Sequence, residues 1–210
     1  SDILKQINRV ETDLNAVADS LHSSRVAASG AFMDAISDSI HAMELPYAIF
    51  QVELNEAPLS STGRDTVIFK FSSTGKNPVD VSKCASGGEM SRIMLAFKKI
   101  VGDYDEIPTL IFDEIDAGIS GIAADKVGRQ LKNLSKSKQV ICVTHLAQIA
   151  AAGDNHLLIS KSSLNGATYT KVLKIDGDQR VKEIARIMSG SEMTENLYNS
   201  AKELIENHNK

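Results

Sequence analysis

The feature that most constrains the fold of this chain is a predicted helix that begins with two glycines. It is followed by a predicted strand that ends in two acidic residues. Ser86 and Glu89 have the spacing of a capping box, so we expect Ser86 to be the N-cap of a helix with Gly87 and Gly88 in its first turn. Such a turn offers unpaired backbone N–H groups to an anion, and the helix dipole favours the same charge. Apolar residues then recur at helical spacing at Met90, Ile93, Met94, Phe97, Ile100 and Val101.

A short apolar run follows at 109–112 and ends abruptly in Asp113 and Glu114. The run is typical of a buried parallel strand. Carboxylates at the C-terminal end of such a strand lie where α/β sheets bind ligands. Alone, each pattern more often means a well-started helix or a solvated loop. In this order and at this spacing they favour a functional site with phosphate-type chemistry.

The two motifs resemble those of a known family. Residues 86–89 (SGGE) and 109–114 (TLIFDE) are similar to the signature motif and the Walker B strand of ABC-type ATPases. Residues 115–121 (IDAGISG) narrow the resemblance to the RecN branch of the SMC-like proteins. Residues 143–148 (VTHLAQ) resemble that family's His switch, and residues 180–186 (RVKEIAR) resemble its C-terminal region.

The resemblance implies chemical roles for three residues and implies ATP and Mg²⁺ as cofactors. Asp113 corresponds to the metal residue and Glu114 to the base that activates water. His145 corresponds to the residue that senses the γ-phosphate. A lone histidine after a strand is more often structural, but its place after a second predicted parallel strand favours a functional role.

Two further sets of residues are implied to act between two heads. Ser86, Gly87, Gly88 and Glu89 would reach, in trans, the nucleotide held by the other head of a head-to-head homodimer. Asp116 and Ser120 correspond to a cross-dimer loop. Ser120 replaces an acid that many SMC-like proteins have, which puts the usual acidic contact in doubt.

The chain has no P-loop of its own. The pattern G-x-x-x-x-G-K-[ST] is absent, and around Gly75-Lys76 the first glycine is replaced by Lys70. The chain also begins with Ser1 inside a helical pattern, so we expect part of a longer protein. The resemblance implies that a Walker A lobe from the N-terminal half of the same protein is a partner. The isolated chain is expected to be inactive, and the whole protein to be an ATPase.

The predicted fold class is α/β. We expect a largely parallel sheet covered by helices, as in the C-terminal lobe of an ABC/SMC-type head, with residues 1–45 as a coiled-coil end and residues 46–210 as the lobe. Two interpretations, a heptad seam and a simple amphipathic helix, fit the apolar positions Ile3, Ile7, Val10, Leu14, Val17 and Leu21. Strands are expected at 47–54, 66–71, 109–112, 139–143, 156–160 and 167–175, with a turn-rich connection at 55–65. Helices are expected from Gly87, after Gly121, and at 146–152, 181–188 and 195–207.

Composition limits the classes of partner. With 210 residues and a net charge of −4, the chain has no global basic signal for nucleic acid, so DNA contact needs a local patch or other parts of the protein. Lys132, Lys136 and Lys138 form a small basic group that reads mainly as a solvated helix end. Cys84 and Cys142 form no CxxC pair, and we expect no disulfide between them. No membrane-length apolar run occurs, and we expect a cytoplasmic, nucleoid-associated protein.

These patterns and the resemblance together predict one function and leave one alternative. The first is a RecN-like head that dimerises around ATP and drives DNA engagement in recombinational double-strand-break repair. The alternative is the head of another SMC-like protein that tethers DNA, with ATP mainly controlling dimerisation. Residues 115–121 favour the first. Comparing DNA-end bridging with ATP and with a non-hydrolysable analogue separates a motor from a tether.

Overall fold

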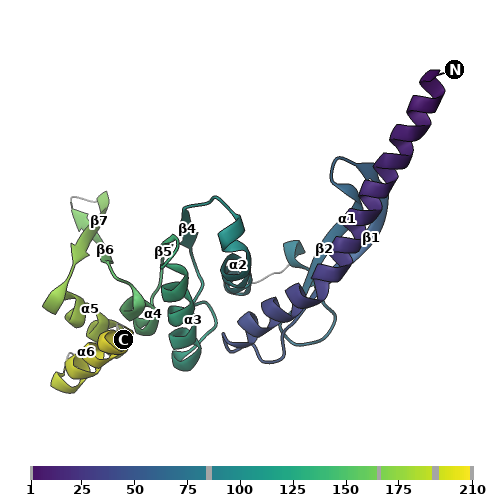
Figure 1. Cartoon of the computed structure of the whole chain (residues 1–210). Coiled ribbons are helices and arrows are strands. Elements are labelled where there is room, and N and C mark those ends of the chain that lie inside the picture. The colour runs from purple at the N-terminus through teal and green to yellow at the C-terminus, as the bar shows by residue number, and fades with distance from the viewer. Residues whose placement is uncertain (1, 84–86, 165–166, 191–193, 209–210) are drawn as a thin grey trace. The chain divides into compact units, whose positions relative to one another are not determined.

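The computed structural model describes residues 2–83, 87–164, 167–190 and 194–208. The chain divides into two compact units, residues 1–86 and 87–210 (Figure 1). The sequence predicts a boundary at 45/46 instead. The unit boundary lies later because the strands that follow residue 45 pack on the long N-terminal helix and belong to the same unit.

The second unit contains a βαβ element. Strand β4 (Thr109–Phe112) and strand β5 (Gln139–Cys142) are parallel, with Leu110 opposite Val140 and Phe112 opposite Cys142. Helix α3 (Gly121–Leu134) connects them, and helix α2 (Gly87–Val101) with a short 3-10 turn (Gly102–Tyr104) precedes them. Leu110 and Phe112 are buried, whereas Ile111 is 69% exposed. One face of the strand pair is therefore covered and the other is bare.

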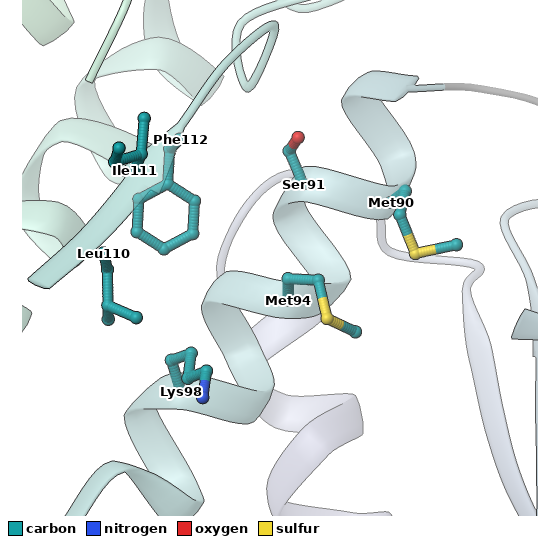
Figure 2. A pocket seen from close by; sticks show the side chains of 7 residues that line it. All are labelled: Met90, Ser91, Met94, Lys98, Leu110, Ile111 and Phe112. Carbon is teal, nitrogen blue, oxygen red and sulfur yellow. The ribbon is translucent and has the colours of Figure 1, made fainter. Parts of the chain in front are cut away.

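An open hollow of about 220 Å³ lies between α2 and β4 (Figure 2). The side chains of Met90 and Met94 line its helix side, and Leu110 and Phe112 line its strand side. The hollow has Lys98 at one end and Ser91 at the other.

Three helices and a hairpin complete the second unit. They are α4 (Ala147–Ala152), the hairpin β6 (His156–Leu164) and β7 (Ala167–Ile175), then α5 (Gly177–Ser189) and α6 (Glu195–His208). The helices share a core of small and branched residues: Ala147, Ala151, Ile184, Ala185 and Ala201. The hairpin extends away from α5 and α6 in Figure 1, and its apolar residues, such as Ile159 at 56% and Val172 at 57%, remain exposed.

The sheets are smaller and less parallel than the sequence predicts. Within the described residues, β4 and β5 form the one parallel pair, while β1-β2-β3 and β6-β7 are antiparallel. Parallel neighbours need a long crossover, and the described strands contain a single one, through α3. The expectation of a largely parallel sheet is wrong for the described part of the chain, which is a mixed α/β structure.

The first unit consists of one long helix and a hairpin. Helix α1 (Asp2–His41) is followed by β1 (Ile49–Ser60), β2 (Gly63–Ser72), β3 (Val79–Asp80) and a 3-10 turn (Val81–Lys83). The turn-rich connection expected at 55–65 is wrong, because both strands continue into it and turn tightly before Gly63. Gly63 has φ +94°, a conformation that favours glycine, and a Cβ there would lie 2.9 Å from Leu21 Cδ2.

An aromatic cluster holds the hairpin against α1. Phe32 of α1 lies 6.1 Å from Phe50 of β1 and 6.0 Å from Phe69 of β2, measured between ring centroids. Phe50 and Phe69 stack on each other at 5.7 Å. Aromatic pairs at such separations add about 0.5–1.5 kcal/mol each beyond the area they bury. The cluster therefore fixes which face of α1 the hairpin covers.

The expected heptad seam of α1 stays largely uncovered. Its six residues are between 37% and 68% exposed, and Leu21, which lies against the hairpin turn, is the least exposed. Pairing of this seam with another helix remains a prediction. Among the described residues, no helix is long and apolar enough to cross a membrane.

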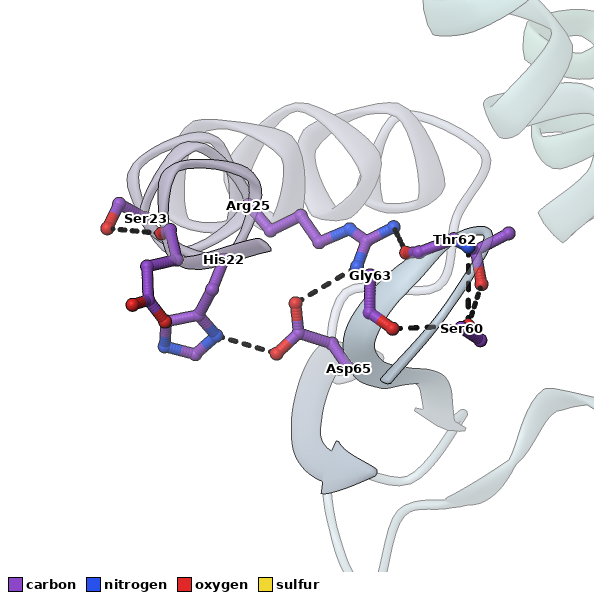
Figure 3. A network of polar contacts seen from close by, with 8 residues as sticks. His22, Ser23, Arg25, Ser60, Thr62, Gly63 and Asp65 are labelled. Carbon is purple, nitrogen blue, oxygen red and sulfur yellow. Dashed lines mark hydrogen bonds and ion pairs between the residues drawn. The ribbon is translucent and has the colours of Figure 1, made fainter. Parts of the chain in front are cut away.

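A buried carboxylate ties the hairpin turn to α1 (Figure 3). Asp65 of β2 accepts hydrogen bonds from His22 Nδ1 at 2.6 Å and from Arg25 Nη1 at 2.9 Å. Arg25 Nη2 also donates to the Thr62 carbonyl at 2.8 Å. The hydrogen bonds and charges of His22 and Arg25 lower the pKa of Asp65 below its usual value of 3.8, although burial opposes them.

Because the folded pKa of Asp65 is lowered, the stability it confers is present above pH 3.8 and is lost as pH falls through the folded pKa. We expect Asp65→Asn to destabilise the chain at about pH 6, and the difference from wild type to shrink towards about pH 3. Urea denaturation at both pH values measures it. Asp13→Asn, at an exposed position of α1, is the control, and an unchanged difference across this range would contradict the assignment.

Candidate functional site

The turn that follows β4 displays the two acids found in the sequence. Asp113 is exposed, and its Oδ1 accepts the backbone N–H of Glu114 at 2.9 Å. The Glu114 carbonyl then accepts the Ala117 N–H at 3.0 Å. Glu114 has φ +55°, in the left-handed region that non-glycine residues seldom occupy. Such a conformation persists only where the surroundings hold it.

The start of α2 packs directly against this turn. A Cβ on Gly87 would lie 2.6 Å from Glu114 Oε2, so the Glu114 carboxylate lies beside the first residue of the helix. A Cβ on Gly88 would lie 2.8 Å from the Ala117 carbonyl oxygen and 2.9 Å from Ala117 Cβ. Real Cβ atoms do not approach backbone so closely, so position 88 requires glycine, whereas at position 87 the end of the flexible Glu114 side chain could move aside. Ser86, the expected N-cap, lies outside the described residues.

Two side chains of α2 hold the turn from the helix side. Arg92 is only 4% exposed and donates through Nη1 to the carbonyls of Ile115 at 3.2 Å and Ala117 at 3.0 Å. Burial lowers the pKa of Arg92 below its usual 12.5, while Glu89 opposes the shift. Ser91 Oγ donates to the Asp113 carbonyl at 2.8 Å. Helix α2 and the turn that carries Asp113 and Glu114 therefore form one packed structure.

On its other side the turn is bonded to the loop that follows β5. Asp116 is 3% exposed, and its Oδ2 accepts the Thr144 hydroxyl at 2.5 Å and the His145 backbone N–H at 2.9 Å. His145 Nδ1 lies 3.2 Å from the same oxygen. The His145 ring itself is 76% exposed. The Nδ1 side of the imidazole thus lies beside the Asp116 carboxylate, and most of the ring is open to solvent.

The single cysteine thiol that the structure describes lies next to these acids. Burial, with the negative charges of Asp116 and Asp113, raises the pKa of Cys142 to about 12. The Cys142 thiol is free, and Cys84 lies outside the described residues. A thiol with so high a pKa is a poor nucleophile, which fits a packing role.

The structure brings some predicted site residues together and separates others. Gly87, Gly88 and Glu114 are adjacent, and Asp116 adjoins His145. Glu89 lies in the first turn of α2. Ser120 precedes α3 and is exposed, so it can face a partner, whereas the Asp116 carboxylate is directed into its own chain. The cross-dimer role of these two residues remains a prediction.

The donor set fits Mg²⁺ only together with a bound phosphate. Among the described residues, no group of three or more His, Cys, Asp or Glu side chains could hold a metal ion. Mg²⁺ commonly uses one or two carboxylates plus phosphate oxygens and water. The exposed Asp113 carboxylate can supply such a single ligand. A Mg²⁺ ion at Asp113 would therefore need further oxygen ligands, such as phosphate oxygens and water.

Sequence reasoning missed Arg92 and Thr144. Arg92 occupies a buried stripe of α2 with Gly88 and Ala96, so a charge at a core position was the available signal. Thr144 stands directly before His145 and gives no local signal. Its hydroxyl donates to Asp116 and accepts the Leu146 N–H at 3.1 Å, which shapes the start of α4.

No family model matches the chain. It is, however, 42% identical over 193 residues to the DNA repair protein RecN of Vibrio cholerae, a match that covers 90% of this chain. It is 39% identical over 207 residues to RecN of Haemophilus influenzae and 36% over 215 residues to RecN of Halalkalibacterium halodurans. The chain is a RecN homologue. It spans 35%, 37% and 38% of the lengths of these three relatives.

Solved structures support the fold. The Smc head domain with a coiled coil and joint from Pyrococcus yayanosii matches with a TM-score of 0.58 at 21% identity, covering 90% of this chain and 34% of that one. A SmcHead bound to the C-winged helix domain of ScpA matches with a TM-score of 0.50 at 22% identity, covering 78% and 48%. The RecN homologue thus has an SMC-head-like fold with a long N-terminal helix.

The small basic group at the end of α3 and in the turn after it is largely neutralised. Lys132 pairs with Asp154, and Lys138 Nζ pairs with Asp105 Oδ1 at 2.6 Å. The hydrogen bonds from Lys138 and Lys98 lower the pKa of Asp105 to about 2, so this acid stays ionised. Lysines that are already paired with carboxylates attract phosphate weakly, so this group is a poor candidate for a DNA-binding patch.

The close packing at Gly88 predicts that an added side chain lowers the stability of the chain. We expect Gly88→Ala to destabilise the chain by about 1–3 kcal/mol, because the new methyl overlaps Ala117 and the backbone must shift. Gly121→Ala is the matched control, since its Cβ would meet only Gln148 Nε2 at 3.6 Å. Urea denaturation measures both. Equal stability of the two variants would argue against the close approach of α2 and the turn.

Proposed function

We propose that this RecN homologue is the C-terminal lobe of an ATPase head. The observation that carries the proposal is the turn of residues 113–118. It presents two exposed acids, is packed against the glycine start of α2, and is bonded to the loop that carries His145. Within one chain these parts supply a metal carboxylate, a base and an imidazole, which phosphoryl transfer to water uses, and beside them an anion-binding helix start that can serve a second head. The whole protein would act in the cytoplasm, at the nucleoid, in recombinational double-strand-break repair.

The partner we propose is a complementary lobe of the same protein that carries a Walker A loop. The bare face of the β4–β5 pair supports this, since Ile111 is 69% exposed, Ile141 43% and Val143 48%. Parallel strands occur almost only with both faces covered. The exposed apolar faces of the β6–β7 hairpin support it further, because a two-stranded hairpin is marginal in water. A second lobe would cover this apolar surface and supply the missing phosphate cradle.

Within one head, the two acids would divide the work. Asp113 would join the ligand shell of Mg²⁺, which when bound neutralises charge on the phosphates. Glu114 would accept a proton from the attacking water. Its carboxylate lies against Gly87 at the start of α2, where the helix dipole stabilises negative charge. His145 would contact the terminal phosphate through its exposed ring.

Between heads, the start of α2 would bind the nucleotide held by the opposite head. Residues 86–89 would then act in trans, and ATP would join two heads into a homodimer. Contact with DNA would follow from this cycle in the whole protein. The exposed seam of α1 supports a continuing coiled coil, since its apolar residues are free to pack on another helix.

The first test concerns nucleotide binding by the chain alone. We expect the 210-residue chain to show no micromolar affinity for Mg-ATP by calorimetry, because it lacks a P-loop. The protein that also contains the N-terminal region of its relatives should bind. Tight binding by the chain alone would contradict the proposed division of the head.

The second test separates the two acids in the whole protein. Glu114→Gln should lower ATP turnover by about 10²–10⁴-fold, the usual contribution of a general base, while ATP binding persists and a dimer accumulates. Asp113→Asn should instead weaken Mg-ATP binding, because a metal ligand is lost. Glu203→Gln, at an exposed position of α6, is the control.

Steady-state hydrolysis and light scattering with ATP measure both effects. Turnover at the wild-type rate in Glu114→Gln, or a loss of nucleotide binding like that of Asp113→Asn, would overturn this division. DNA-end bridging that is equal with ATP and a non-hydrolysable analogue would favour a tether over a motor.

A further inference from the structure

The Asp116 carboxylate is the most heavily bonded acid of the site. It is 3% exposed, and one oxygen, Oδ2, faces three groups of the loop after β5. They are the Thr144 hydroxyl at 2.5 Å, the His145 N–H at 2.9 Å and the His145 Nδ1 at 3.2 Å. The mechanism proposed above gives Asp116 no task, and the cross-dimer role expected for it does not use these bonds.

The chemistry of the contacts determines the state of the imidazole. An ionised carboxylate only accepts hydrogen bonds, so a bare Nδ1 lone pair 3.2 Å from Asp116 Oδ2 would be repelled, and a neutral His145 ring is favoured with its proton on Nδ1. Its Nε2 then carries a free lone pair. A neutral imidazole in water has no partner that fixes this choice, and in proteins the hydrogen bond at one nitrogen sets the state of the other.

We propose that Asp116 is a positioning residue that fixes His145 as the Nδ1–H tautomer and directs its Nε2 outward. This proposal rests on the ATPase function proposed above and deepens it. With Nε2 unprotonated, the neutral ring accepts a hydrogen bond, as from a water molecule beside the phosphate. It donates to a phosphate oxygen only when the ring is protonated. Asp116 therefore makes Nε2 of the neutral histidine a hydrogen-bond acceptor rather than a donor.

The same bonds join the two loops that carry the reacting groups. Asp116 lies two residues after Glu114 and shares its turn, while Thr144 and His145 belong to the loop after β5. One buried carboxylate thereby links the turn that carries Glu114 to the loop that carries His145. Arg92 holds the carbonyls on both sides of Asp116, those of Ile115 and Ala117, so the carboxylate has a fixed support.

The first experiment reads the tautomer directly and needs no activity. In the 210-residue chain labelled with ¹⁵N-histidine, long-range ¹H–¹⁵N correlation spectra at about pH 8, above the usual pKa of imidazole, distinguish protonated from bare ring nitrogens. We expect Nδ1–H for His145 in wild type. Asp116→Ala should shift its signals towards the Nε2–H form. An Nε2–H ring in wild type overturns the proposal without any variant.

Ser91→Ala is the matched control for this experiment. It removes a different side-chain bond to the same turn, the one to the Asp113 carbonyl, and leaves Asp116 untouched. The His145 signals should stay in the Nδ1–H pattern. The signals of His22, His41, His156 and His208 report whether each variant is folded. A tautomer change in Ser91→Ala equal to that in Asp116→Ala would mean that general loosening, rather than the carboxylate, sets the tautomer.

The second experiment asks whether Asp116 acts through His145. In the whole protein we expect Asp116→Ala to lower kcat by about 10–100-fold with KM little changed, the size typical for losing a carboxylate that orients a histidine. In a His145→Ala background the same change should cost less than about 2-fold, because coupled residues are non-additive. Additive losses overturn the proposal.

The two experiments separate the failure of this inference from the failure of the proposed function. If the wild-type whole protein hydrolyses no ATP while His145 is Nδ1–H, the ATPase proposal fails and the assignment of Asp116 to the tautomer stands. If hydrolysis proceeds and His145 is Nε2–H, the ATPase proposal stands and the assignment of Asp116 to the tautomer fails.

Discussion

The site depends on the close approach of the start of α2 to the turn after β4. Gly88 allows the helix backbone to lie against Ala117, and Arg92 donates to the carbonyls of the same turn. A side chain at position 88 would separate the two elements by the width of a methyl group. The glycines are therefore needed twice, once for packing and once to leave the backbone N–H groups of the helix start uncovered.

The opposite side of the turn is fixed by charge rather than by packing. Asp116 is buried where an unpaired carboxylate would be costly, and the Thr144 and His145 donors offset that cost. Because the turn is packed on α2 on one side and bonded to the loop after β5 on the other, it can keep Glu114 in a left-handed conformation that is otherwise unfavourable. The order of dependence runs from helix packing to turn geometry, and from turn geometry to the placement of Glu114 and His145.

Local patterns predict most elements well but not their partners. Strand β4 was predicted at its observed limits, because four apolar residues stand between Pro108 and two acids. The strand segment at 55–60 was missed because half of its residues are polar and most are exposed, and its strand structure comes from pairing with β2. The bonds of Asp116 could not be predicted, because they depend on β5 lying beside β4. Ile111, which the apolar run assigns to a buried strand, is exposed here.

The dimensions of α1 have a mechanical consequence. Its 40 residues make a rod about 60 Å long at the usual helical rise, and a tilt of about 10° at its base would move the far end by about 10 Å. The hairpin braces the rod as far as Asn15, which accepts a hydrogen bond from Arg64 at 3.1 Å. The Asp65 bonds to His22 and Arg25 lie lower on the same brace. Bending of α1 would therefore concentrate in the segment before Asn15. The part of α1 that the hairpin braces would move as a stiff lever when its base rotates.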